Sequence, residues 1–359
     1  MHILYDGQIY ARQTAGGINR YFANLISRLP KDVFPTLTTR QILDVNYPTH
    51  PNLKTFLYKG FRPRRISDSL EKHYFQAIAT FKHFDLIHPT YYSLLSQKDF
   101  NFYRYPLVLT VHDMIYEIFY PNDPHIEEKR KAIMTAQAII CVSENTKKDL
   151  LEYYSLPEDK ITVTYLASEV DSSLSYGSES VPIYPYYLYV GSRSSYKNFD
   201  TLLAAFAKVV SVKSEVRLCI VGSPFNRQEE QLIAALNLSE RIEHYNNVSD
   251  SHLAKLYRCS VAFVYPSLYE GFGIPPLEAM SCGTVAVVSN TSSIPEVVGD
   301  AGLLFDPKAT YDLAEILLLL LDKPTERDQF IAKGYKRAKI FSWNKTAAQT
   351  LQVYRSVCS

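Results

Sequence analysis

The stretch VAFVYPSLYEGFGIPPLEAM, residues 261–280, has the pattern of a strand, a glycine loop and the start of a helix. Residues 261–265 are nearly all apolar, which is typical of a strand covered on both faces of a parallel sheet. Gly271 and Gly273 let the loop backbone approach a ligand closely, and the Pro-Pro pair at 275–276 suits a first helical turn. The stretch predicts one strand–loop–helix unit of a parallel α/β sheet, in which ligands bind at the carboxyl ends of the strands.

The alternation of strands and helices continues on both sides of this stretch. Short apolar segments between helical patterns predict parallel sheets with helices on both faces. In the second half the expected strands are 187–190, 217–221, 241–245, 261–265, 285–288 and 302–305, and the expected helices include 199–212, 228–236, 251–258 and 294–298. In the first half the expected strands are 3–5, 86–88, 107–112 and 138–142, with a helix over 18–29. The predicted fold class is α/β, with two doubly wound, Rossmann-like domains.

The chain length also indicates two domains, because 359 residues are too many for one ordinary domain. A stretch rich in serine, glycine and proline separates the two series of strands, and we predict a linker over 171–185. We therefore expect a first domain over 1–170 and a second over 186–344, followed by a final helix over 345–359.

Composition argues against several classes of protein. The formal net charge is +1, which gives no case for a nucleic-acid partner. Five cysteines without CxxC spacing predict reduced thiols in a cytoplasmic protein, not a disulfide framework or a metal site. The N-terminal stretch lacks the pattern of a signal peptide. The most apolar run, 316–321, is far shorter than the ~20 residues of a membrane span.

Two carboxylates, Glu270 on the glycine loop and Glu278 in the following helix, flank a run of backbone amides. Amides of a loop and a helix start can face an anion, and the carboxylates could bind sugar hydroxyls. A glycine turn with two solvated acids, one of which favours the helix dipole, explains the same residues. Spacing alone leaves both interpretations open.

Cations and a histidine follow other expected strands. Arg193 and Lys197 come directly after strand 187–190, where they could hold a diphosphate and neutralise it as it leaves. A solvated basic loop is the alternative. His112 ends strand 107–112, where it could bind a sugar hydroxyl or polarise the reacting centre. A purely structural histidine is the alternative.

The adjacent Gly16 and Gly17 precede the helix expected over 18–29, and their amides could meet a phosphate. A flexible turn explains them equally well. With the carboxylates, the cations and the histidine, the chain has four ligand-friendly positions at strand ends, divided between two domains. One shared cleft explains this distribution better than four coincidences do.

These motifs resemble those of one known family. The segment 270–278 resembles the paired-glutamate motif of retaining GT-B glycosyltransferases of family 4, and 290–302, NTSSIPEVVGDAG, resembles the segment that follows it. The loop 191–198 resembles the family's diphosphate-binding loop, and the glycine pair and the strand-end histidine match landmarks of its first domain. The resemblance spans nearly the whole chain. It implies a GT-B fold, in which two Rossmann-like domains face each other across a cleft and the C-terminal helix crosses back to complete the first domain.

The resemblance also implies roles for individual residues. Arg193 and Lys197 would bind the donor diphosphate, and Glu270 would hold hydroxyls of the transferred sugar. Glu278 would bind the ribose, and His112 would contact the donor sugar near the reacting carbon. The further donor-binding positions are Gly16, Gly17, Val248 near the nucleobase, and the amides of Phe272, Gly273, Ile274 and Pro275. The expected catalytic residues are His112, Arg193, Lys197 and Glu270.

The implied activity is transfer of a hexose from a nucleotide-sugar, with retention at the anomeric carbon, to a glycan or lipid-linked glycan of a cell-surface polysaccharide. The string GGINRY at 16–21 and the pair His112-Asp113 resemble bacterial mannosyl- and rhamnosyltransferases, which favours GDP-mannose. A UDP-sugar is the alternative donor. The sequence has no Asp-x-Asp pair that would hold a divalent metal on a diphosphate, so we expect no metal and no cofactor.

The segment KGFRPRR, residues 59–65, mixes cations with an aromatic residue. Through Lys59, Arg62, Arg64 and Arg65 it could contact an anionic membrane or a lipid diphosphate, which would place the protein peripherally at the inner membrane surface. A solvated basic loop is the alternative.

The sequence also argues against two other functions. A dinucleotide-dependent oxidoreductase would need a G-x-G-x-x-G turn after an early strand, whereas the turn at 271–273 lacks the third glycine and comes late. A non-catalytic nucleotide-sugar-binding protein would not need the histidine, both cations and the loop glutamate together.

Overall fold

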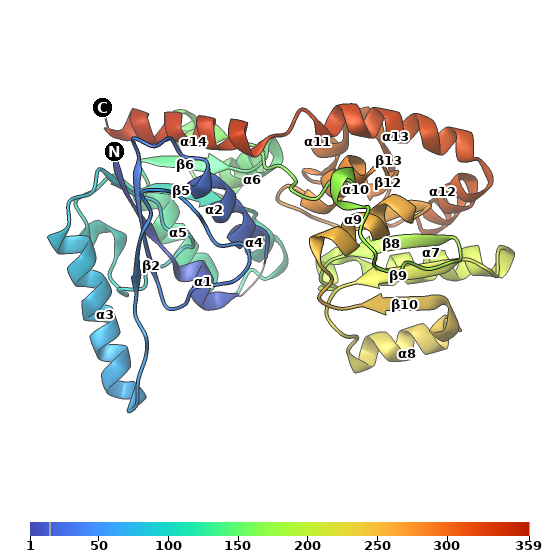
Figure 1. Cartoon of the computed structure of the whole chain (residues 1–359), viewed down its shortest axis with the longest axis horizontal. Helices are drawn as coiled ribbons and strands as arrows, with labels where there is room; N and C mark the ends of the chain where they lie inside the picture. The colour runs from blue at the N-terminus through green and yellow to red at the C-terminus, as the bar shows by residue number, and fades with distance from the viewer. Residues whose placement is uncertain (14–15, 359) are drawn as a thin grey trace. The chain divides into compact units, whose positions relative to one another are not determined.

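Figure 1 shows a computed structural model of the chain, which describes residues 1–13 and 16–358. The chain divides into two compact units. The first unit comprises Met1–Leu166 and the C-terminal segment from Ser342 onward, and the second comprises Ala167–Phe341. Each unit contains parallel strands and its own buried residues, so each has a separate core.

All strand pairs of the first unit are parallel. Four strands pair in the order β3-β2-β1-β4 and three in the order β5-β6-β7, and a parallel bridge between Ile87 and Leu107 joins the two sets. The strand order reverses between β1 and β4, which is the switch point where α/β sheets bind ligands. The strands are β1 (His2–Asp6), β2 (Phe34–Thr39), β3 (Lys54–Leu57), β4 (Leu86–Ile87), β5 (Val108–Val111), β6 (Ala138–Cys141) and β7 (Ile161–Val163).

The helices of the first unit bury apolar residues at helical spacing. In α2 (Gly17–Ser27) the buried residues include Tyr21, Phe22 and Leu25, as expected of an amphipathic helix. α14 (Trp343–Cys358) packs against α2, β4 and β6, which confirms the prediction that the C-terminal helix returns to the first domain. The remaining helices are α1 (Gln8–Arg12), α3 (Arg64–Phe81), α4 (Ile115–Phe119), α5 (His125–Thr135), α6 (Glu144–Tyr153), η1 (Phe100–Phe102) and η2 (Glu158–Lys160).

The six strands of the second unit are parallel and pair in the order β10-β9-β8-β11-β12-β13. This is the 3-2-1-4-5-6 order of a doubly wound nucleotide-binding sheet. The order reverses between β8 and β11, so the loops after these two strands border the crevice that binds ligands in such sheets. The strands are β8 (Tyr186–Val190), β9 (Arg217–Val221), β10 (Ile242–Tyr245), β11 (Ala262–Tyr265), β12 (Ala286–Ser289) and β13 (Gly302–Phe305). The predicted α/β class is confirmed.

The central strand β8 buries tyrosines because their hydroxyls reach backbone carbonyls. Tyr186 donates to Leu256 O at 2.7 Å and Tyr187 donates to Leu317 O at 2.6 Å. Without such partners each buried hydroxyl would cost about 1–3 kcal/mol. The helices of this unit are α7 (Phe199–Val212), α8 (Arg227–Ala235), α9 (Asp250–Cys259), α10 (Ile274–Cys282), α11 (Ile294–Val298), α12 (Thr310–Asp322) and α13 (Pro324–Ala338), with short 3-10 helices η3 (Ser172–Leu174), η4 (Ser195–Lys197), η5 (Ser239–Arg241) and η6 (Gly299–Ala301).

The segment 171–185, expected to be a linker, belongs to the second unit. Lys255 on α9 donates through Nζ to the carbonyls of Gly177 at 2.8 Å and Glu179 at 2.7 Å. These charge-assisted bonds attach the irregular segment 171–185 to α9. The composition of the segment does not reveal this attachment. The boundary between the units falls after Leu166.

The cysteines are free thiols. Cys141, Cys219 and Cys282 are buried, and burial raises the pKa of the Cys141 thiol to about 12. In the described part of the chain, no helix is both long enough and apolar enough to cross a membrane.

Candidate functional site

An ion pair joins the two loops at the switch point of the second sheet. Lys197 follows β8 and Glu270 follows β11. Lys197 Nζ lies 2.7 Å from Glu270 Oε1 and 2.9 Å from Oε2, and the side chains are only 13% and 9% exposed. The loop backbones also meet, since Leu268 N donates to Tyr196 O at 2.7 Å. The predicted diphosphate-binding cation and the predicted sugar-binding carboxylate are therefore in direct contact.

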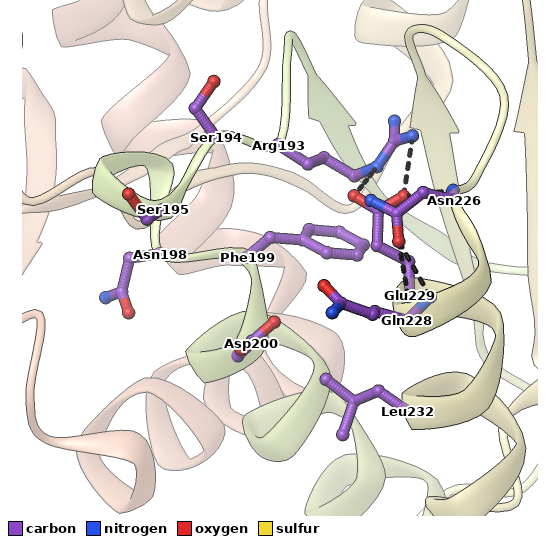
Figure 2. A pocket seen from close by; sticks show the side chains of 10 residues that line it. All are labelled: Arg193, Ser194, Ser195, Asn198, Phe199, Asp200, Asn226, Gln228, Glu229 and Leu232. Carbon is purple, nitrogen blue, oxygen red and sulfur yellow. Dashed lines mark hydrogen bonds and ion pairs between the residues drawn. The ribbon is translucent and has the colours of Figure 1, made fainter.

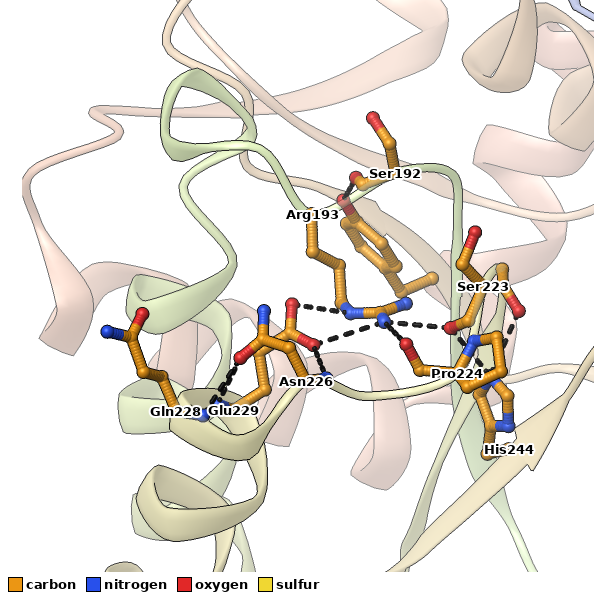
Figure 3. Close-up of polar contacts among 10 residues, drawn as sticks. Ser192, Arg193, Ser223, Pro224, Asn226, Gln228, Glu229 and His244 are labelled. Atoms are coloured by element: carbon orange, nitrogen blue, oxygen red, sulfur yellow. Dashed lines mark hydrogen bonds and ion pairs between the residues drawn. The ribbon is translucent and has the colours of Figure 1, made fainter.

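Arg193, in the loop after β8, is held by a carboxylate and two carbonyls (Figure 3). Its Nε lies 2.9 Å from Glu229 Oε1, and its Nη2 lies 3.2 Å from Glu229 Oε2. Nη2 also donates to Ser223 O at 2.7 Å and Pro224 O at 2.9 Å. The side chain is 4% exposed, and its Nη1 is buried without a hydrogen-bond partner among the residues that the structure describes.

A cavity of about 330 Å3 borders this arginine (Figure 2). Its wall is largely polar and comes from the loop after β8 and from the first turns of α7 and α8. The lining residues are Arg193, Ser194, Ser195, Asn198, Phe199, Asp200, Asn226, Gln228, Glu229 and Leu232. The pair of Arg193 and Glu229 therefore forms one wall of a hollow beside the predicted diphosphate-binding loop.

Two serines after β12 hold the glycine loop that carries Glu270. Ser292 Oγ accepts from Glu270 N at 2.9 Å. Ser293 is buried, and its Oγ shares its hydrogen between the carbonyls of Glu270 and Phe272, each at 2.8 Å. Both serines lie in the segment 290–302. Sequence analysis did not choose them, although the family resemblance of this segment was a signal that they are close to the loop.

The start of α10 has the backbone geometry expected of a ligand-facing glycine loop. Gly273 is the N-cap with φ of 105°, a left-handed conformation that favours glycine. The expected contribution of a Pro275 amide has to be corrected, because proline carries no N–H. At this helix start the predicted donors are therefore Phe272, Gly273 and Ile274, and Pro275 contributes a fixed φ instead.

Glu278 lies in α10 and is 4% exposed. Tyr257 on α9 donates its hydroxyl to Glu278 Oε2 at 3.1 Å. This bond fixes the orientation of a carboxylate that the family resemblance assigns to the ribose. A ribose hydroxyl would meet an acceptor that the protein has already oriented.

His112 follows β5 in the first unit. The rings of Tyr21 and Phe22 pack edge-on against its imidazole at 5.2 and 6.2 Å, and its Nε2 is buried with no hydrogen-bond partner in the described residues. Burial, and then the charge of Lys129, lower the His112 pKa to about 3. The imidazole is therefore neutral at pH 7, the form that suits a hydrogen bond to a sugar hydroxyl.

The other predicted positions lie at element ends. Gly16 is the N-cap of α2 and Gly17 its first residue, and a Cβ on Gly16 would lie 2.7 Å from Gln13 Nε2. Val248 is half-buried between β10 and α9. In the second unit Lys197 contacts Glu270 on the glycine loop. His112 and the glycine pair belong to the first unit.

Among the described residues, no group of three or more His, Cys, Asp or Glu side chains could hold a metal ion. The most informative residue that was missed is Glu229. It lies three positions after Asn226, the N-x-x-E spacing of a capping box, and this signal marks a carboxylate with a fixed position.

A doubly wound sheet with two cations after its first strand and a carboxylate after its fourth is suited to binding a nucleotide through its phosphates. With a second parallel sheet in the other unit, the chain belongs to the class of nucleotide-dependent α/β proteins with two Rossmann-like units.

Comparison with known proteins identifies the family within this class. Residues 15–170 match the model of Glycosyltransferase Family 4, and residues 178–337 match that of Glycosyl transferases group 1. O-antigen chain mannosyltransferase B of Escherichia coli is 32% identical over 268 residues, covering 69% of this chain and 70% of that protein. The MMP alpha-(1->4)-mannosyltransferase of Mycolicibacterium hassiacum is 32% identical over 64% of this chain and 56% of its own length. The chain belongs to glycosyltransferase family 4 and is a glycosyltransferase.

Solved structures support the fold. Sucrose-phosphate synthase (tll1590) from Thermosynechococcus elongatus aligns with a TM-score of 0.81 at 22% identity, over 99% of this chain and 98% of that one. Anabaena Alr3699/HepE, in complex with UDP-glucose, aligns with a TM-score of 0.77 at 18% identity, over 99% and 100% of the two chains. These similarities show the GT-B fold alone.

Proposed function

We propose that the chain is a retaining, metal-independent hexosyltransferase that transfers mannose from GDP-mannose to a glycan or lipid-linked glycan during polysaccharide assembly. The observation that carries the proposal is the contact between Lys197 and Glu270 at the switch point of a nucleotide-binding sheet. The names of two relatives, both mannosyltransferases and one of them acting on an O-antigen chain, support the choice of sugar and pathway.

The proposed donor would exchange the ion pair for substrate contacts. Lys197 would neutralise the leaving diphosphate, and Glu270 would accept hydrogen bonds from hydroxyls of the transferred sugar. Both side chains are largely buried, so their interactions with charge that develops on the leaving group are less screened than in water. Arg193 Nη1 would provide a second positive contact to the diphosphate.

Front-face substitution accounts for retention in this proposal. The acceptor hydroxyl forms its bond to the anomeric carbon on the side from which the diphosphate leaves, and the departing phosphate oxygen takes the hydroxyl proton. The protein then needs no covalent nucleophile. It holds charges in place and excludes water, and neutral His112 would hydrogen-bond the donor sugar.

A cavity in the first unit supports the acceptor part of the proposal. It measures about 450 Å3 and lies at the carboxyl ends of β1 and β4, the switch point of that sheet. Aromatic rings suit stacking on sugars, and the cations suit an anionic group on the glycan. The lining residues are Gln8, Arg12, Tyr92, Ser93, Leu94, Gln97, Lys98, Asp99, Phe100, Glu128 and Lys131.

Calorimetric titration with GDP, UDP, dTDP and ADP tests the donor. We expect GDP to bind most tightly. Selective binding of UDP would replace GDP-mannose by a UDP-sugar, and the absence of binding by any of the four would refute the donor site.

The reaction itself is tested by incubating GDP-mannose and a mannan acceptor in excess EDTA and determining the anomeric configuration of the product by NMR. We expect an α-linked product from the α-linked donor and full activity without metal. A β-linked product would refute retention, and activity that returns only with added Mg²⁺ or Mn²⁺ would refute metal independence.

A further inference from the structure

Glu229 engages Arg193 with both carboxylate oxygens, at 2.9 Å to Nε and 3.2 Å to Nη2. Figures 2 and 3 draw this contact. The two side chains are 12% and 4% exposed, which places the pair among the most buried ion pairs of the described part of the second unit. Glu229 Oε2 also accepts from Asn226 N at 2.8 Å, as part of the capping box of α8. The carboxylate therefore fastens the arginine to the start of a helix.

The opposite side of the guanidinium is fixed as well. Nη2 donates to the carbonyls of Ser223 and Pro224. His244 Nε2, from β10, lies 2.9 Å from Gly222 O and 3.0 Å from Ser223 O, so it holds the same loop (Figure 3). These contacts use the hydrogens on Nε and Nη2 and favour a single orientation of the guanidinium.

The third nitrogen of the guanidinium, Nη1, makes none of these contacts. Nη1 is buried and has no hydrogen-bond partner among the described residues. Gly222 lies beside it, and a Cβ at position 222 would come within 3.2 Å of Nη1. A charged N–H that is withdrawn from water and unbonded is unfavourable. A phosphate oxygen is the partner whose charge and geometry match a guanidinium N–H.

We propose that Glu229 is the positioning residue that fixes Arg193 so that Nη1 meets the diphosphate of the donor. This inference rests on the proposed donor site and adds a residue that acts through Arg193. A carboxylate beside the diphosphate would otherwise repel the ligand. Here the ion pair with Nε and Nη2 neutralises the Glu229 carboxylate. The carboxylate also sets the direction in which the N–H groups of Nη1 point.

The test measures the preference for GDP over GMP, because only GDP carries the second phosphate. Glu229→Gln keeps an oxygen that can accept from Asn226 N and removes the charge that orients the arginine. We expect it to weaken GDP binding roughly tenfold, the lower end of the loss seen when a partner that orients a metal-binding side chain is removed, and to leave GMP binding unchanged. The matched control is Asn226→Ala, which removes the other half of the capping box, where Asn226 Oδ1 accepts from Gln228 N and Glu229 N. It should retain the GDP preference.

Two further variants separate this inference from the proposed function. Arg193→Gln should lose the same preference, and Arg193→Gln with Glu229→Gln should lose no more than Arg193→Gln alone. If Arg193→Gln keeps the wild-type preference, the proposed donor site itself fails. If Arg193→Gln loses the preference but Glu229→Gln keeps it, or if Asn226→Ala loses as much as Glu229→Gln, only the positioning role is overturned.

Discussion

At the scale of single residues, the contact between Lys197 and Glu270 gives each side chain two functions. In the structure each neutralises the other in a largely buried position. In the proposed reaction each would turn to a different part of the donor. The structural and catalytic roles of Lys197 can be separated because only the structural role depends on the charge of Glu270.

Lys197→Ala is expected to lower kcat roughly 100- to 1,000-fold, because it removes one preorganised charge from the leaving group. It should also destabilise the second unit by about 3–5 kcal/mol, since it leaves the Glu270 carboxylate buried without its partner. The additional change Glu270→Gln should restore much of the stability and none of the activity, measured by urea denaturation and by product formation. As a control, Lys213→Ala breaks an exposed pair with Asp322 and should change neither. Wild-type turnover in Lys197→Ala would contradict the site.

Buried histidines make the first unit sensitive to acid. Burial lowers the pKa of His88 and of His112 to about 3, with smaller contributions from neighbouring charges. The unfolded chain takes up protons on both below pH 6.5 and the folded unit does not, so their stability contribution is lost as pH falls. Asp6 acts with opposite sign, because burial raises its pKa to about 7. Its contribution is fully present below the ordinary aspartate pKa of about 4 and is lost as pH rises from there to about 7.

Between pH 6 and 5 the unfolded chain binds about two more protons on the histidines than the folded unit does, and about one fewer on Asp6. Unfolding therefore takes up about one proton in total. Between pH 6 and 5 the first unit should therefore lose about 1.4 kcal/mol of unfolding free energy per pH unit. Denaturation followed by the fluorescence of the buried Trp343 measures this slope. His112→Gln should reduce the slope to near zero. An unchanged slope in that variant would refute the assigned neutral state of His112.

At the scale of elements, α14 completes the buried polar network of the first unit. Tyr354 OH lies 2.6 Å from His88 Nδ1 and 3.0 Å from Tyr5 OH, and all three side chains are fully buried. His88 Nε2 continues the network to Thr110 Oγ1 at 2.9 Å. The last helix therefore supplies a hydrogen-bonding group as well as apolar surface.

Tyr354→Phe is expected to destabilise the first unit by about 1–3 kcal/mol, because it leaves buried polar groups without a partner. The urea concentration at the midpoint of unfolding, followed by Trp343 fluorescence, should fall. A matched control in the other unit is Tyr187→Phe, which removes the bond to Leu317 O and should leave the Trp343 midpoint unchanged. Equal effects of both variants on Trp343 would contradict the assignment of α14 to the first unit.

The start of α3 is unusual for a helix terminus. Arg64 and Arg65 occupy its first turn, where positive charge opposes the helix dipole and no acidic residue compensates. Phe61 and Ile66 beside them are 46% and 54% exposed. Exposed cations next to exposed apolar side chains suit the surface of an anionic membrane.

Neutralising Arg62, Arg64 and Arg65 should abolish flotation with anionic liposomes and leave transfer to a water-soluble acceptor intact. Each cation near such a surface contributes about 1 kcal/mol. As a control, a variant in which the exposed Lys31, Arg104 and Lys148 of the same unit are neutralised should still float with the liposomes. Flotation that survives the first triple substitution would refute the membrane contact expected from the sequence.

At the scale of the whole molecule, the two units have separate cores, and the single tryptophan reports on only one of them. Circular dichroism reports on both. We expect two unfolding transitions, of which the Trp343 signal follows one. GDP at 100 times its dissociation constant should stabilise the second unit by about 2.7 kcal/mol. This raises the midpoint temperature of the other transition by on the order of 5–10 °C. A shift of the Trp343 transition alone would place the nucleotide in the wrong unit.

The sequence by itself predicted the α/β class and the six strands of the second unit, because buried parallel strands are continuous apolar runs. It missed β2, β3 and β7 of the first unit, of which β7 is only three residues long. The segment of β2 contains a proline and three threonines, and that of β3 is half exposed, so neither forms an apolar run. β2 pairs with β1 and β3 pairs with β2, and this pairing between strands, which is a tertiary event, makes both segments strands.

The sequence also determined which chemical groups the proposed donor site contains, since Arg193, Lys197 and Glu270 each lie in the segment that follows an apolar strand. Only the tertiary structure decided which of them meet. Lys197 and Glu270 are 73 residues apart, and Arg193 and Glu229 are 36 apart. Local patterns contain no information on such pairs, because the strand order of the sheet, and not spacing along the chain, sets which loops become neighbours.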